Sequence, residues 1–111
     1  MLRAGRHPLP DPRDFATAMN RLGIGANTKV VAYDDAGGST AARLWWLLHA
    51  LGQPVAVLDG GLTAWPGPLV TEPSVPRPVA RSAQPWPRER FVGADAVANA
   101  PSVIDARTPA R

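Results

Sequence analysis

Near the start of the chain, apolar residues recur with helical spacing. Four of them are separated by three and four positions and form one stripe of a helix: Phe15, Ala18, Met19 and Leu22. Asp11 can cap such a helix, and Pro12 suits its first position. Gly23 is a typical left-handed stop at a helix C-terminus. The pattern therefore predicts an amphipathic helix between Asp11 and Gly23.

Two short apolar runs without alternation follow, at residues 29–34 and 55–59. Runs of this kind are typical of strands covered on both faces of a parallel sheet. Between them, a second helical pattern is expected to begin with Ser39 or Thr40 as its cap and to end before Gly52. The apolar surface of this helix is wide, which indicates burial on more than one side.

Strand, helix and strand in this order predict a βαβ unit, and hence an α/β fold with a parallel sheet. In such a unit, the loop at residues 34–38 and the turn at residues 59–61 lie at the same C-terminal edge of the sheet. Open α/β folds place their ligands at this edge.

Proline becomes frequent after residue 65: seven of the 22 residues in 66–87 are Pro. Proline excludes helix and central strand, so a semi-extended linker is expected. Beyond it, one short helix at residues 92–99 and a strand at residues 102–107 are predicted. We therefore divide the chain into a partial first domain at 1–65, a linker at 66–90 and the start of a second domain at 91–111.

Composition and charge exclude several classes of function for this chain. The chain has 111 residues and no cysteine, which excludes a disulfide framework and cysteine catalysis by this chain alone. Eleven of the twelve basic residues are Arg, but they are scattered and the net charge is only +3, so no nucleic-acid partner is expected. No secretory signal and no membrane span is found, and a soluble, cytoplasmic protein without membrane contacts is expected.

The loop at residues 34–40 is the most informative stretch for chemistry. Its glycines can turn N–H groups inward, and the following helix adds its positive end, which together form a cradle for an anion. The alternative is a plain β-to-α turn in which Asp34 caps its own loop. Asp34 and Asp35 could hold Mg²⁺, but no third ligand is found. No metal and no organic cofactor is therefore expected.

The run at residues 30–34, the glycine-rich loop, the Trp45-Trp46 helix and the Leu-Asp-Gly-Gly-Leu-Thr-Ala-Trp run at 58–65 resemble a rhodanese-like domain. In this order, the motifs are most similar to the first domain of tandem-domain sulfurtransferases that act on thiosulfate or 3-mercaptopyruvate. The run at 103–111 resembles the opening of the second, catalytic domain of these enzymes.

This resemblance implies a rhodanese-like fold, here incomplete, and a place for Asp34 at the position of the catalytic cysteine. A carboxylate cannot form a persulfide, so no catalytic residue is assigned. Arg111 matches an arginine that binds the anionic group of the donor, and its guanidinium suits sulfonate or carboxylate oxygens. The missing second domain would be the packing partner, and a small anionic sulfur donor the substrate.

Two functions follow from these observations. In the first, the chain is an inactive fragment of a sulfurtransferase that moves sulfane sulfur to a thiophilic acceptor through a cysteine persulfide. In the alternative, it is a non-catalytic rhodanese-like module that binds an anion or a protein.

Overall fold

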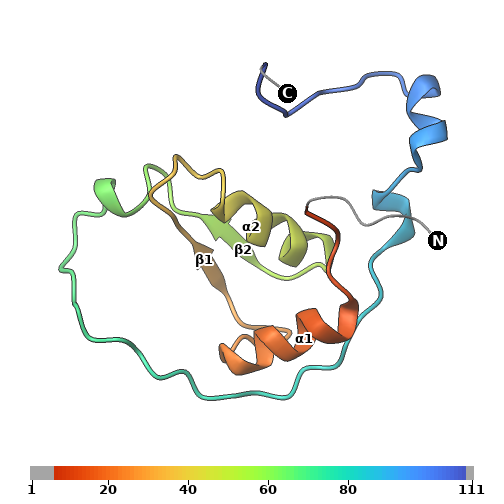
Figure 1. The fold of residues 1–111 in the computed structure, drawn as a ribbon. Coiled ribbons are helices and arrows are strands. Elements are labelled where there is room, and N and C mark those ends of the chain that lie inside the picture. Colours follow the sequence, from red (N-terminus) through yellow and green to blue (C-terminus); the bar gives the residue numbers. More distant parts are fainter. Residues whose placement is uncertain (1–6, 110–111) are drawn as a thin grey trace.

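The computed structural model describes residues 7–109, and its elements follow the predicted order (Figure 1). Helix α1 spans Pro12–Arg21, strand β1 Val30–Ala32, helix α2 Ala41–Ala50 and strand β2 Val55–Val57. Three short 3-10 helices follow, η1 at Leu62–Ala64, η2 at Arg88–Arg90 and η3 at Ala94–Asn99. The fold is a small α/β arrangement with an unclosed sheet.

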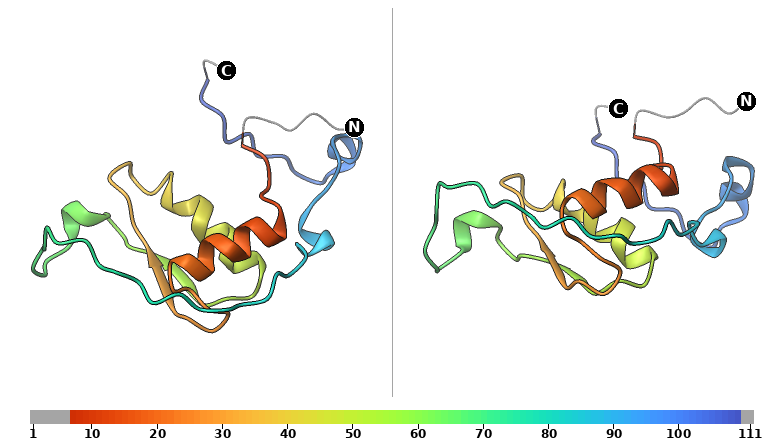
Figure 2. Two further views of the ribbon diagram at one scale, coloured as in Figure 1. Left: turned by 60° about the horizontal axis from the view of Figure 1, so that its bottom comes forward. Right: turned by 90° about the horizontal axis from the view of Figure 1, so that it is seen from below.

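The sheet of the described residues contains two parallel strands, with Val30 opposite Val55 and Ala32 opposite Val57. Because α2 connects the two strands, they form the predicted βαβ unit. Both helices lie on the same side of the sheet (Figure 2). The core between these layers is built from Phe15, Met19, Leu47 and Leu48, and Leu48 is completely buried.

Helix α1 forms where its sequence predicts it. The Asp11 carboxylate accepts hydrogen bonds from the N–H groups of Arg13 and Asp14, at 2.8 and 3.3 Å. The buried stripe differs from the prediction, because Ala16 is buried while Ala18 and Leu22 are exposed. Leu22 caps the helix where the chain turns away, which removes its side chain from the core.

The expectation that both faces of the strands are covered is wrong. Val31 and Tyr33 point to the face that carries no helix, and they are 58% and 57% exposed. Ala32, on the helix side, is buried. Only one layer of helices is present in the described residues, so one face of the sheet lies open.

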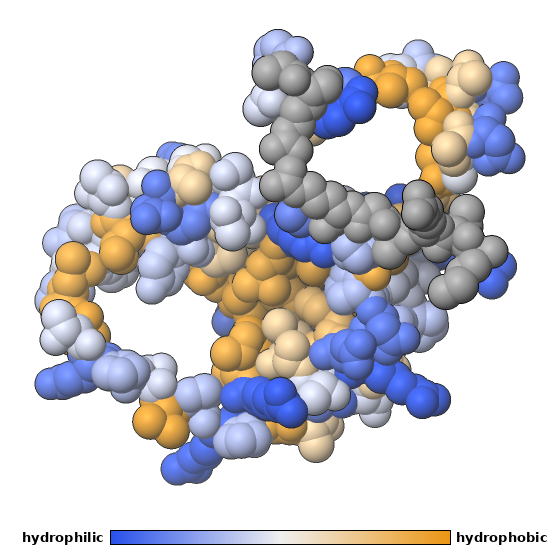
Figure 3. Space-filling model, viewed as in Figure 1, coloured by the Kyte–Doolittle hydropathy of each residue, from blue (hydrophilic) through white to orange (hydrophobic). Residues whose placement is uncertain are grey.

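Residues 66–87 contain no helix or strand, as predicted from their prolines. Their two parts behave differently. Residues 66–78, which we call the arch, swing away from the sheet, and Figure 3 shows an opening between them and the rest of the molecule. Residues 79–86, which we call the latch, run along α1 (Figure 2).

The latch is bound through specific contacts. Asn20 pairs with Arg81 twice, donating to its carbonyl oxygen at 3.2 Å and accepting from its N–H at 2.7 Å. Arg81 also donates to the Gln53 side chain at 2.8 Å, and Gln53 is buried. The Trp86 ring lies 5.2 Å from that of Phe15, and its N–H donates to the Pro10 carbonyl. The latch therefore completes the core around α1.

Residues 88–109, which we call the tail, are exposed throughout. A helix occurs near its predicted place at Ala94–Asn99, but in the tighter 3-10 form. The strand predicted at residues 102–107 is wrong, because this stretch lacks a neighbouring strand and has no regular structure. The division into a linker at 66–90 and a second domain at 91–111 stays a prediction.

Candidate functional site

Asp34 lies just beyond the C-terminal end of β1, and its carboxylate turns into the following loop. One oxygen, Oδ1, accepts hydrogen bonds from the N–H groups of Ala36 at 3.0 Å and Gly38 at 2.8 Å. The other, Oδ2, accepts from Thr40 at 2.8 Å and Ala41 at 2.7 Å. Both oxygens are thus held by backbone donors, and the last two donors belong to the first turn of α2. Asp34 is the acid that caps its own loop.

These donors fix the charge of the site. The N–H of Ala41 contributes most, followed by that of Gly38, and together with Ala36 and Thr40 they lower the pKa of Asp34 below its ordinary value. Partial desolvation acts in the opposite direction; it is smaller than the effect of either Ala41 or Gly38 and is outweighed by the four hydrogen bonds together. The cradle therefore holds a permanent negative charge near neutral pH.

The capping of α2 differs from the expectation that a Ser39 or Thr40 hydroxyl would cap the helix. Thr40 is the N-cap residue of α2, but its side chain makes no capping hydrogen bond. The Ser39 hydroxyl donates to the Ala36 carbonyl at 3.0 Å. Because the Asp34 carboxylate already reaches the free N–H groups of Thr40 and Ala41, it takes the role predicted for a local hydroxyl.

Two glycines allow the loop to close around the carboxylate. Gly38 has a φ of +91° and presents its N–H to Asp34. Gly61, from the turn after β2, has a φ of +62°, and a Cβ atom there would collide with the carbonyl oxygen of Asp34. The two turns at this edge of the sheet are therefore in direct contact, as the βαβ topology predicts.

The other residues singled out by the sequence do not join this site. Arg111, the tentative donor-binding arginine, lies outside the described residues. Asp35 is exposed. No group of three or more metal-ligating side chains occurs among residues 7–109. The oxygens of Asp34 are taken by backbone N–H groups, so the sequence reading of a Mg²⁺ pair gains no support.

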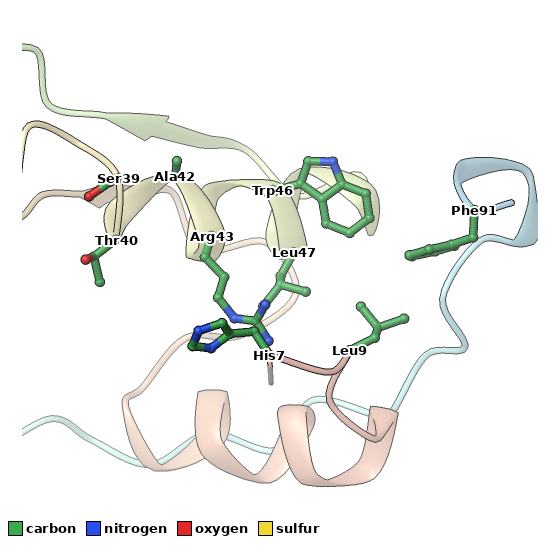
Figure 4. A pocket seen from close by; sticks show the side chains of 9 residues that line it. All are labelled: His7, Leu9, Ser39, Thr40, Ala42, Arg43, Trp46, Leu47 and Phe91. Atoms are coloured by element: carbon green, nitrogen blue, oxygen red, sulfur yellow. The ribbon is translucent and has the colours of Figure 1, made fainter. Parts of the chain in front are cut away.

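Away from the Asp34 loop, a hollow of about 860 Å³ lies between α2, the segment before α1 and the start of the tail (Figure 4). His7 and Arg43 lie next to each other at one end, and Arg43 donates to the Pro8 carbonyl at 2.8 Å. At the other end, Trp46 meets Phe91 edge to face at 5.3 Å. The sequence gives no direct sign of this hollow, because Phe91 and His7 are far from α2 along the chain. The wide apolar surface of α2 was its only sequence signal.

No helix in the described part of the chain has the length and apolar character needed to cross a membrane.

Comparison with known proteins identifies relatives of this chain. Residues 2–67 match the family model described as Rhodanese-like domain. The chain is 54% identical over 63 residues to "Probable 3-mercaptopyruvate sulfurtransferase" of Pseudomonas aeruginosa, a match that covers 55% of this chain and 22% of the relative. It is 44% identical over 84 residues to human 3-mercaptopyruvate sulfurtransferase, covering 70% and 28%.

A longer match is found with 3-mercaptopyruvate sulfurtransferase of Escherichia coli, which is 34% identical over 113 residues. It covers 95% of this chain and 40% of the relative. The chain thus spans between about a fifth and two fifths of the length of these relatives. No solved structure matches the chain.

Proposed function

Because the chain belongs to the family of rhodanese-like domains, we propose that it is the non-catalytic part of a sulfurtransferase. In the complete enzyme, sulfane sulfur would pass from thiosulfate or 3-mercaptopyruvate to a thiophilic acceptor through a cysteine persulfide. One observation carries the assignment of this chain to the non-catalytic part: the carboxylate of Asp34 fills the cradle of backbone N–H groups at the end of β1.

The chemistry of that carboxylate supports the assignment. A carboxylate has no sulfur atom that could accept a sulfane sulfur, and the chain has no cysteine elsewhere. Its charge also opposes the approach of thiosulfate or 3-mercaptopyruvate, because both donors are anions. The same carboxylate weakens the alternative of an anion-binding loop, since the N–H groups that would bind an anion are already occupied.

The first test is a direct assay of the purified chain with thiosulfate and cyanide. We expect no thiocyanate above the background without protein, because no residue can carry the sulfur. A full-length relative serves as the positive control in the same assay. Turnover by the chain alone would overturn the proposal.

The second test restores a thiol at the centre of the cradle through Asp34→Cys. Four N–H groups and the start of α2 should stabilise a thiolate there, so we expect its pKa to fall below the ordinary value of about 8.5. The pH dependence of thiolate absorbance measures this pKa. The matched control is Ser82→Cys, at an exposed position of the latch. Equal pKa values for the two thiols would contradict the role given to the loop.

The same variant also tests sulfur transfer. The thiolate of Asp34→Cys would attack the sulfane sulfur of thiosulfate, sulfite would leave, and a persulfide would remain on the protein. Mass spectrometry of the intact chain would detect the added sulfur atom. We expect this product from Asp34→Cys and much less from Ser82→Cys.

A further inference from the structure

The outer edge of β1 has no neighbouring strand among the described residues. The N–H of Val30 donates to Pro54 at 3.2 Å, and the carbonyl of Ala32 accepts from Leu58 at 2.9 Å, so both residues direct their peptide groups to β2. Because successive peptide groups of a strand alternate in direction, those of Val31 lie on the outer edge. This edge is a template for another strand.

Beside this edge lies an apolar groove of about 660 Å³, on the open face of the sheet. Its walls are the exposed face of β1, the turn after β2 and the arch, and no charged residue lines it. Val31, Tyr33, Leu58, Trp65 and Leu69 are among the side chains that form these walls. In Figure 1, the outer edge of β1 faces the opening that the arch encloses. The groove suits an uncharged, extended segment with apolar side chains.

The tail contains a segment of this kind. Val103 and Ile104 are β-branched, and they are 62% and 91% exposed. The sequence predicts a strand here, and within the described residues these two positions make no backbone hydrogen bond. Asp105 and Arg107 form an ion pair at 2.6 Å, which leaves the segment without net charge. The segment around Val103 and Ile104 therefore has a strand-forming sequence but no neighbouring strand among the described residues.

We propose that two copies of the chain associate through these features, with residues 102–105 of one copy added to the outer edge of β1 in the other. Pairing Ile104 with Val31 directs both side chains to the same face, so Ile104 enters the groove. A sheet of two strands is marginal, and a third strand would stabilise it. The edge and the segment are different surfaces, so the contact either closes reciprocally into a dimer or continues into longer assemblies.

Charge favours a parallel orientation. In parallel pairing with Ile104 opposite Val31, Arg107 lies opposite Asp34. Asp35 follows directly, so this end of the paired strands is acidic. In antiparallel pairing Arg107 would lie opposite Thr28, at the other end of β1 from both acids. The parallel arrangement also matches the β1–β2 pair, which is rich in valine.

A second copy must supply the segment, because the tail and the groove lie on opposite sides of the molecule. In Figure 1, residues 100–109 lie above and to the right of α2, whereas the opening beside β1 lies to the left. Both views in Figure 2 keep the tail and the arch apart.

Light scattering coupled to size-exclusion chromatography tests the association. We expect a mass of at least twice that of one chain, falling to one chain on dilution. Ile104→Lys and Val31→Lys each place a charge in the groove, so each should yield a single chain. Val75→Lys, at a 94% exposed position of the arch, should associate like the parent chain. A single-chain mass at every concentration, or equal behaviour of Ile104→Lys and Val75→Lys, would overturn the proposal.

Because the chain has no cysteine, disulfide trapping can test the orientation. In the parallel register Ser102 lies opposite Lys29, whereas in the antiparallel one it lies opposite Tyr33. Mixed Ser102→Cys and Lys29→Cys chains should form a mixed disulfide under mild oxidation several-fold faster than Ser102→Cys with Tyr33→Cys. Peptide mass analysis identifies the product. Equal rates, or a faster reaction with Tyr33→Cys, would overturn the parallel pairing. Circular dichroism of each variant checks that the fold is retained.

Discussion

Two regions of this chain have similar strand-forming sequences, but one of them packs around an apolar core and the other is exposed. Residues 11–58, together with the latch, bury an apolar core, and their strand β1 pairs with β2. The tail contains a comparable run at residues 102–104, yet every described residue of the tail is exposed. The difference lies in the surroundings, because a strand needs a neighbour for its backbone hydrogen bonds and an apolar layer for its side chains.

The latch shows how a segment between these regions gains structure. It has no regular secondary structure, but its side chains reach the core and its polar groups find partners on α1 and on Gln53. The tail begins directly after it and has no such contacts with α1. Order in this chain therefore follows tertiary contacts more closely than local sequence preference.

The largest effect is expected from Leu48→Ala in the core of the first region. Leu48 is completely buried, so its truncation removes apolar contacts and leaves a cavity. We expect the free energy of unfolding to fall by about 2 to 5 kcal/mol. Urea denaturation followed by tryptophan fluorescence measures this loss. The control is Ile104→Ala in the tail, which should leave the midpoint unchanged at low protein concentration.

A smaller loss in the free energy of unfolding is expected from Trp86→Ala in the latch. The half-buried ring packs on Phe15, and its N–H donates to Pro10 at 2.8 Å. We expect a loss of about 2 kcal/mol, below the values typical of fully buried aromatic residues. Limited proteolysis should then cut within residues 79–86 faster than in the parent chain, where Asn20 and Gln53 hold this segment through Arg81. The comparison variant is Trp65→Ala, since Trp65 is 46% exposed and should cost less. Equal losses would mean that the latch does not complete the core.

The third prediction concerns the pH dependence of stability through Asp34. Its pKa is lowered in the folded chain, so its contribution is complete above the unfolded value of about 3.9. That contribution is lost as the pH falls through the folded value, because protonation of one oxygen weakens the two hydrogen bonds it accepts and removes the charge that strengthens all four. Asp34→Asn should therefore lower the melting temperature by a few degrees near neutral pH.

The difference between the parent chain and Asp34→Asn should shrink steadily below about pH 4. Differential scanning fluorimetry across this pH range measures it. Asp35→Asn serves as the control, since Asp35 is exposed. A difference between Asp34→Asn and the parent chain that stays constant down to the acid limit would contradict the charged cradle.

The sequence was sufficient to predict the βαβ unit and the helix of α1. Periodicity, the Asp11 cap and the glycine stops are local signals, and each occurs where the element begins or ends. The loop was also located correctly, and the possibility that Asp34 caps it was recognised. Thr40 is the N-cap residue as expected, but its hydroxyl does not cap the helix, because a carboxylate six positions before it reaches the same N–H groups.

The remaining differences depend on contacts between distant parts of the chain. Exposure of Val31 depends on which layers cover the sheet, and the pairing of Asn20 with Arg81 joins residues 61 positions apart. The absence of a strand at residues 102–107 follows from the lack of a neighbour. Local sequence patterns predict which residues can form a helix or strand, but they do not show which distant residues will pack against that element or pair with it.

The contact between Gly61 and the carbonyl oxygen of Asp34 has a consequence for mutational tolerance. Any side chain at position 61 would push against the backbone that carries the acid, and so would misalign a loop more than twenty residues earlier in the chain. Substitutions at these two positions should therefore be interdependent, and a library that randomises both should return glycine at position 61 whenever position 34 retains its hydrogen bonds.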